Sequence, residues 1–158
     1  MPGPGEEAYN RRMFERARKL LRLSPSDRRL ILTTALLLSA ARLALGLLPV
    51  RTVRRLTTRA IPRRPGAAAP DPAYPARVGW AIRAVAPDVG ANCLPQALTA
   101  ALLLQRRGHP VTLTIGLRRD DTTRVAGHAW VESEGRIVIG GDELAAYTPL
   151  QASSRHGW

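Results

Sequence analysis

Hydrophobic residues recur at helical spacing in the first third of the chain. Over residues 8–23 they are separated by Arg and Lys, which predicts a short basic amphipathic helix. Ser24-Pro25-Ser26-Asp27 then offers N-cap residues and an early proline for a second helix, which we expect to end near Leu48 because Pro49 follows. Residues 61–75 are rich in proline and cannot form a regular element. The first half of the chain therefore predicts helices followed by a linker.

Helical spacing returns after the linker and then gives way to alternation. We expect a short helix over residues 76–86 and a longer one from Asn92, which can cap the first turn, to Gly108, which stops it. Pro95 is tolerated there because its missing N–H falls in the first turn. Alternating apolar residues predict antiparallel strands over 111–117, 125–132 and 136–140, with a turn over 133–135.

These elements predict the α+β class, in which a cysteine-bearing helix packs on a small antiparallel sheet behind an N-terminal helical segment. We divide the chain into a basic helical segment over 1–64, a proline-rich linker over 65–75 and an α+β core over 76–158.

The most hydrophobic stretch, residues 30–50, is long enough to span a bilayer. Arg42 lies near its middle, where an arginine costs about 2.5 to 3.5 kcal/mol on insertion scales. Arginines also flank both ends, so the positive-inside rule assigns no orientation. We favour a core helix over contact with a membrane surface, and disfavour a span.

The chain carries 24 Lys and Arg against 12 Asp and Glu, a formal net charge of +12. Residues 1–64 hold 15 of the bases and 4 of the acids, a net of +11, and residues 65–158 hold 9 and 8, a net of +1. Such a basic segment is typical of proteins that bind nucleic acids or anionic membranes. No zinc-finger, RNP-like or helix-turn-helix pattern accompanies it, so we expect no nucleic-acid partner. A basic helical arm can equally dock an acidic leader or protein.

Cys93 is the only cysteine, which excludes an internal disulfide and a multi-cysteine zinc site. It shows no metal-ligand spacing with the three histidines, so we expect neither metal nor cofactor. The N-terminus shows no cleavable signal pattern, and the expected compartment is the cytoplasm.

Cys93 and His128 form a candidate catalytic pair. A helix N-terminus favours a thiolate through its unpaired N–H groups and its dipole. A nucleophilic thiol also needs a base, and His128 lies 35 residues later on a predicted strand that it shares with Trp130 and Glu132 on one face. The alternative is structural, because a lone cysteine is often a small buried hydrophobe.

A third group must hold the imidazole in the correct tautomer. With a tight turn over 133–135, the residues opposite His128 fall near 140 or 141, so we expect Asp142 in this role. Glu132 is a rival, but it lies about 13 Å along the same strand. Glu134 and Glu143 are less favoured. The order Cys, His, Asp on a helix and a hairpin is that of papain-like and transglutaminase-like cores.

The sequence also resembles a known family over roughly residues 76–150. Three stretches carry the resemblance: Asn92-Cys93-Leu94 through Leu104-Gln105-Arg106-Arg107-Gly108, then Ile115-Gly116-Leu117-Arg118, then Gly127-His128-Ala129-Trp130-Val131-Glu132. They look like the transglutaminase-like leader peptidases of lasso-peptide biosynthesis, the B protein or its separate C-terminal half. Members of that family often place the triad Asp about two residues nearer the His, where this chain has Gly140-Gly141.

The resemblance implies a cysteine peptidase that removes the leader from a ribosomally made precursor peptide and hands the core peptide to an ATP-dependent macrolactam cyclase. Because residues 1–64 predict only helices, we infer the split form, in which a separate leader-recognition protein docks on the peptidase. The expected oxyanion donors are the backbone N–H of Cys93 and the side chain of Gln96. The alternatives are an acyltransferase with the same triad and a non-enzymatic module that binds membranes or nucleic acids through its basic helices.

Overall fold

The computed structural model describes residues 18, 20–47, 70–119, 125–142 and 144–154. Most of the predicted helix over 8–23 and of the proline-rich linker lies outside these residues, as does the connection between the first two predicted strands over 120–124. Arg18 and residues 20–22, at the end of that first helix, are helical.

Besides this short helical end, α2 (Pro25–Leu47), α4 (Tyr74–Val89) and α5 (Cys93–Arg106) precede the sheet in the described part of the chain. Helix α2 starts as predicted, where the Ser24 hydroxyl accepts a hydrogen bond from the Asp27 N–H at 3.1 Å. Helix α4 begins two residues earlier than predicted because Pro75 fits its first turn. Asn92 occupies the N-cap position of α5 with extended backbone, but its side chain makes no capping bond, contrary to our expectation.

The sheet has four antiparallel strands in the order β3-β2-β1-β4: β1 (Thr112–Arg119), β2 (Val125–Ser133), β3 (Arg136–Ile139) and β4 (Thr148–Ser154). The first three were predicted and β4 was not. The turn between β2 and β3 is formed by Glu134 and Gly135, both with positive φ, as a two-residue hairpin turn requires.

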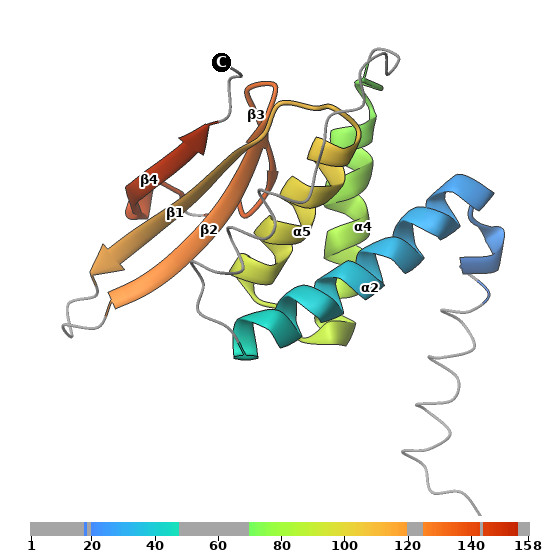
Figure 1. Cartoon of the computed structure of the whole chain (residues 1–158), viewed down its shortest axis with the longest axis horizontal. Coiled ribbons are helices and arrows are strands. Elements are labelled where there is room, and N and C mark those ends of the chain that lie inside the picture. Colours follow the sequence, from blue (N-terminus) through green and yellow to red (C-terminus); the bar gives the residue numbers. More distant parts are fainter. Residues whose placement is uncertain (1–17, 19, 48–69, 120–124, 143, 155–158) are drawn as a thin grey trace, which may run out of the picture.

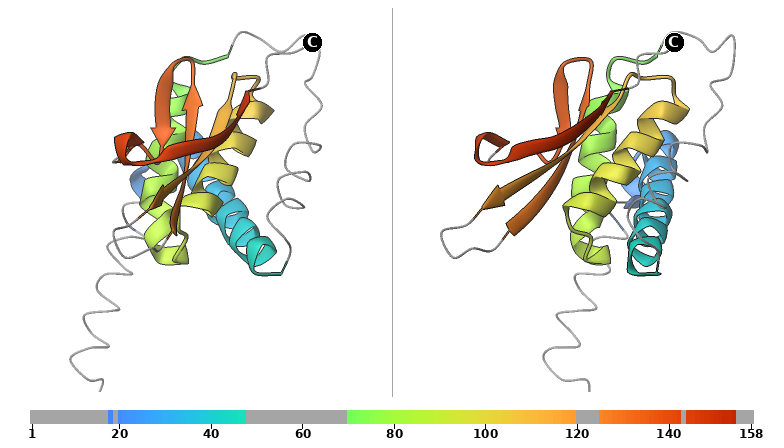
Figure 2. Two further views of the ribbon diagram at one scale, coloured as in Figure 1. Left: turned by 90° about the vertical axis from the view of Figure 1, so that its left-hand side faces the viewer. Right: turned by 60° about the vertical axis from the view of Figure 1, so that its left-hand side comes forward.

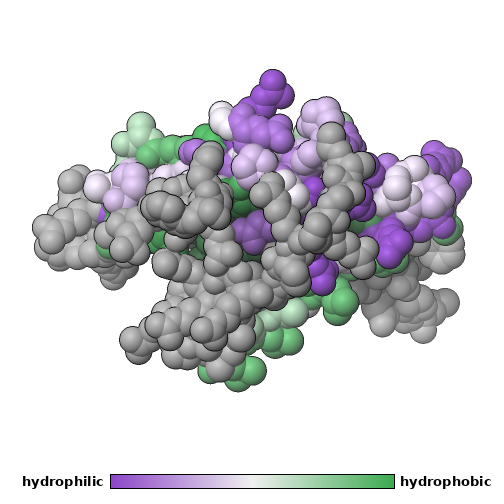
Figure 3. Space-filling view, turned by 45° about the horizontal axis from the view of Figure 1, so that its top comes forward, coloured by the Kyte–Doolittle hydropathy of each residue, from purple (hydrophilic) through white to green (hydrophobic). Residues whose placement is uncertain are grey.

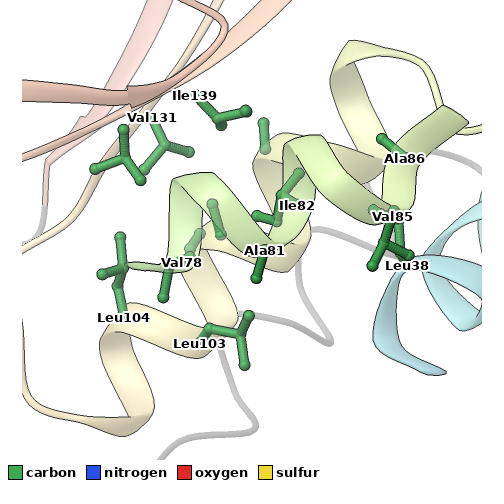
Figure 4. Close-up of a cluster of buried hydrophobic side chains, with 14 of the residues drawn as sticks. Leu38, Val78, Ala81, Ile82, Val85, Ala86, Leu103, Leu104, Val131 and Ile139 are labelled. Atoms are coloured by element: carbon green, nitrogen blue, oxygen red, sulfur yellow. The ribbon is translucent and has the colours of Figure 1, made fainter. Parts of the chain in front are cut away.

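The elements stack in three layers (Figure 2), with α4 and α5 lying between the sheet and α2. Val78, Leu104 and Val131 are fully buried between the helices and the sheet, and Leu38 of α2 packs beside Val85 of α4 (Figure 4). This arrangement confirms the predicted α+β class (Figure 1).

Helix α2 has a buried face and an exposed one. Leu30, Ile31 and Leu38 join the core, which agrees with a core helix. Leu32, Leu36, Leu43 and Leu47 are 62 to 82% exposed. In the described residues, α2 is the one helix long and apolar enough to cross a membrane. Within its most apolar stretch of 18 residues, 22% is buried inside the protein. Figure 3 shows one face of the molecule, where hydrophobic side chains lie at the surface beside hydrophilic ones.

Candidate active site

Cys93 is the first residue of α5 and is half-buried. Pro95 has no N–H, and the Gln96 N–H donates to the Asn92 carbonyl at 3.4 Å. The backbone donors near the thiol without an acceptor inside the helix are therefore those of Cys93 and Leu94. Its Sγ contacts the carbonyl oxygen of Gly127 on β2 at 3.9 Å, to which the thiol can donate a weak hydrogen bond. The thiol therefore lies beside the strand that carries His128.

His128 lies on β2, opposite Gly116 of β1. Its Nε2 is 2.9 Å from the carbonyl oxygen of Gly140, and because a carbonyl only accepts, Nε2 carries the proton. In the neutral ring the lone pair then belongs to Nδ1. This hydrogen bond selects the tautomer in which Nδ1 can act as a base.

A cavity of about 560 Å³ brings the predicted site residues together. Cys93, Gln96, His128 and Asp142 all line it, together with Arg83 of α4 and the backbone around Gly140. The thiol and the imidazole make their hydrogen bonds to main-chain carbonyls and not to each other. The site thus has a nucleophile and a base on two elements facing one open cavity.

Asp142 lies on the wall of this cavity and is exposed. A bulge in the β2–β3 pairing between Val131 and Glu132 shifts the register by one residue, and β3 ends at Ile139. Gly140 then turns the chain away with a φ of +76°. The hydrogen bond from the imidazole, which we expected Asp142 to accept, is accepted by the Gly140 carbonyl.

The other acids considered for this role have different neighbours. Glu132 accepts a hydrogen bond from the Trp130 indole N–H at 3.3 Å. Glu134 lies 3.2 Å from Nδ1 of His109, which is buried and stacks on Tyr74 at 5.7 Å between ring centroids. Burial raises the pKa of Tyr74, partly offset by the nearby Arg107 guanidinium. Glu143 lies outside the described residues.

Gln96 points into the cavity but donates from its side-chain amide to the Ala91 carbonyl at 2.7 Å. The amide group carries two N–H donors, so one is engaged with the loop before α5 and one can face the cavity. Within the described residues, no group of three or more His, Cys, Asp or Glu could hold a metal ion.

Two rings flank the imidazole, and one of them was missed in the sequence. Trp130 stacks at 6.2 Å between centroids, and Tyr147 approaches at 5.0 Å and 31°. The strand alternation places Trp130 on the same face as His128, but nothing in the sequence around Tyr147 signals that it contacts a histidine 19 residues earlier. Gly116 lies opposite His128, and the sequence gives no sign of that pairing.

A model of one protein family matches residues 34–152, which is 119 of the 158 residues and extends from α2 to β4. Comparison with curated proteins gives no match, and neither does comparison with solved structures. The matching family is described as the transglutaminase-like superfamily, and its match agrees with the α+β architecture and the cysteine-bearing helix. The chain belongs to the transglutaminase-like superfamily.

Proposed function

We propose that this protein is a cysteine peptidase that removes the leader from a ribosomally synthesised lasso-peptide precursor. The observation that carries the proposal is the cavity shared by the Cys93 thiol and the His128 imidazole. Membership of a superfamily that includes cysteine peptidases and acyltransferases supports the chemistry. The motif resemblance around Cys93 and from Gly127 to Glu132 supports the substrate.

The reaction starts at the thiol. Rotation of the Cys93 side chain away from the Gly127 carbonyl lets Nδ1 of His128 accept the thiol proton. The thiolate attacks the carbonyl carbon of the bond between leader and core. His128 returns its proton to the departing core amine, and a thioester to the leader remains. Water, deprotonated by His128, then hydrolyses the thioester, giving a free leader carboxylate and the thiol.

The oxyanion of each tetrahedral intermediate needs donors close to Cys93. The backbone N–H of Cys93 lies at the start of α5, where the helix provides no acceptor for it. The side chain of Gln96 can supply a second donor, with its amide held in place by the Ala91 carbonyl. Two donors at the positive end of a helix match the charge that develops in the reaction.

The partners in this proposal are the precursor peptide, a separate leader-recognition protein and a lasso cyclase. The net charge of +11 over residues 1–64 suits docking of an acidic surface. Binding of the recognition protein should then weaken steeply as salt is raised. The proposed compartment is the cytoplasm, where a single nucleophilic thiol stays reduced.

The test mixes the purified protein with precursor and recognition protein and follows product masses. Wild type should release the free leader with one added water, and Cys93→Ala should release none. Arg106→Ala, an exposed change at the far end of the same helix, is the matched control and should cleave normally. Release by Cys93→Ala contradicts the nucleophile assignment.

Two further outcomes would replace the proposal. A leader joined to an added amine, in place of a free carboxylate, identifies an acyltransferase with the same catalytic pair. Salt-dependent binding to DNA or anionic vesicles, unaffected by Cys93→Ala and with no cleavage of any precursor, identifies a non-enzymatic basic module.

A further inference from the structure

The imidazole of His128 contacts a main-chain carbonyl and two aromatic rings. The Gly140 carbonyl accepts its Nε2–H at 2.9 Å. The rings of Trp130 and Tyr147 lie at 6.2 and 5.0 Å, inclined by 25° and 31°. Gly140 follows β3, Trp130 lies on β2, and Tyr147 directly precedes β4. We call the rings of Trp130 and Tyr147 the aromatic clamp.

Two glycines make this arrangement possible. At Gly140, φ is +76° and a Cβ would lie 2.6 Å from the Ala129 carbonyl oxygen, so no side chain fits while the carbonyl stays in place. At Gly116, a Cβ would lie 2.9 Å from the Trp130 ring and 3.0 Å from Cβ of Tyr147. One glycine therefore admits the carbonyl and the other admits the aromatic clamp.

We propose that the Gly140 carbonyl and the aromatic clamp position His128, and that the Asp142 carboxylate is not needed for this. The inference rests on the proposed role of His128 as the base. When the ring takes the thiol proton, its bond to the Gly140 carbonyl becomes charge-assisted, and its contact with Tyr147 becomes a cation–π contact. Both effects favour the imidazolium without a carboxylate partner.

Charged groups around the ring act at longer range. Arg83 and Asp142 line the same cavity with opposite charges. Arg118 lies over the Tyr147 ring, its guanidinium carbon 5.3 Å from the centroid. The Glu132 carboxylate accepts from the Trp130 indole. Each of these charged groups acts on the imidazole across the cavity or through the ring of Trp130 or Tyr147. The Gly140 carbonyl, in contrast, accepts a hydrogen bond from the imidazole directly.

The test measures alkylation of Cys93 by iodoacetamide in the full chain from pH 4 to 9. Alkylation of the chain's single thiol at low pH reports the thiolate paired with an imidazolium. Tyr147→Ala should lower this low-pH rate about tenfold, by loss of a ring contact. Tyr147→Phe keeps the ring and should stay within about twofold. Trp80→Phe, a change at an exposed aromatic outside the cavity, is the control and should match wild type.

Asp142→Asn is the discriminating variant. A true triad acid replaced by its amide costs about 10⁴ in kcat in the best-studied serine protease. We expect a loss of less than about threefold in the alkylation rate. A loss as large as that of Tyr147→Ala, or larger, overturns the proposal, as does a wild-type profile in Tyr147→Ala.

Gly116→Ala keeps the proposal testable if Tyr147→Ala fails to fold. Its new methyl group pushes against both clamp rings, so it should lower the low-pH rate in the same way, and a wild-type profile counts against the clamp. The alkylation assay needs no peptide. Normal alkylation without leader release therefore contradicts the proposed function and leaves the positioning of His128 intact.

Discussion

Replacing Gly140 by alanine tests whether the chain after β3 must approach β2 as closely as it does. The new Cβ would lie 2.6 Å from the Ala129 carbonyl oxygen, about 0.8 Å inside the 3.4 Å of ordinary contact. That oxygen belongs to the main chain of β2 and cannot rotate away. Residue 140 itself must therefore move by several tenths of an ångström.

A second glycine of the same hairpin separates this clash from the backbone cost. Gly135 has a φ of +73°, against +76° for Gly140, and a Cβ there meets nothing within 4 Å. Gly135→Ala should thus lose about 1 to 2 kcal/mol for left-handed backbone alone. Gly140→Ala adds the clash, at about 1 to 3 kcal/mol, and should lose about 2 to 5 kcal/mol in total.

The displacement also reaches the imidazole. If the Gly140 carbonyl moves 0.8 Å away from the imidazole, the distance from Nε2 to the carbonyl oxygen rises from 2.9 Å to about 3.7 Å, and the hydrogen bond is lost. The assays are urea unfolding followed by circular dichroism, and alkylation of Cys93 at low pH in the folded protein. Equal stability losses in the two variants, or wild-type alkylation in Gly140→Ala, would refute the reasoning.

Three other predictions concern stability. Leu38→Ala, at a site with no exposure, should cost about 3 kcal/mol, whereas Leu36→Ala on the 71% exposed face of the same helix should cost less than about 0.5 kcal/mol in thermal unfolding. Thr34→Val should gain about 1 kcal/mol in urea unfolding, because the buried Thr34 hydroxyl has no partner among the described residues; a loss would contradict this. Hydrogen bonds from Ser24 and Arg77 lower the pKa of Asp27 in the folded protein. The stability that this carboxylate contributes is therefore fully present above the pKa of Asp27 in the unfolded chain, and it is lost as the pH falls through the lower pKa of the folded protein. Unfolding of wild type and Asp27→Asn from pH 6 to 2 should therefore converge at the acid end, and a constant difference would exclude the carboxylate as its source.

The helix that carries Cys93 and the hairpin that carries His128 could be predicted because local signals define both. Pro95 is compatible only with the first turn, and apolar spacing continues from there to the end of α5. The residues at 134 and 135 suit a two-residue turn, which sets the initial register of β2 and β3. The fold class follows from these elements, and the proposed pairing of Cys93 with His128 rests on them.

Strand β4 and the aromatic clamp could not be predicted, for two physical reasons. Residues 148–154 show no apolar alternation and include Pro149, so their pairing depends on the open edge of β1 and not on local pattern. Tyr147 reaches His128 only because the chain returns along that edge. Such a contact depends on tertiary structure and leaves no periodic signal.

The hydrogen-bond acceptor for His128 could not be predicted for a different reason. Every residue has a main-chain carbonyl, so no residue type in the sequence marks the one that accepts this bond. A tight turn over 133–135 predicts Asp142 nearly opposite His128, and the bulge between Val131 and Glu132 shifts the register one residue further in that direction. What the count omits is that the strand ends at Ile139, because Gly140 adopts a conformation closed to other residues. The two glycines directly ahead of Asp142 were thus the informative feature. Gly140 has to be glycine for two reasons, its left-handed backbone and the 2.6 Å that a Cβ would leave to the Ala129 carbonyl oxygen, and the same conformation brings its own carbonyl to the imidazole of His128.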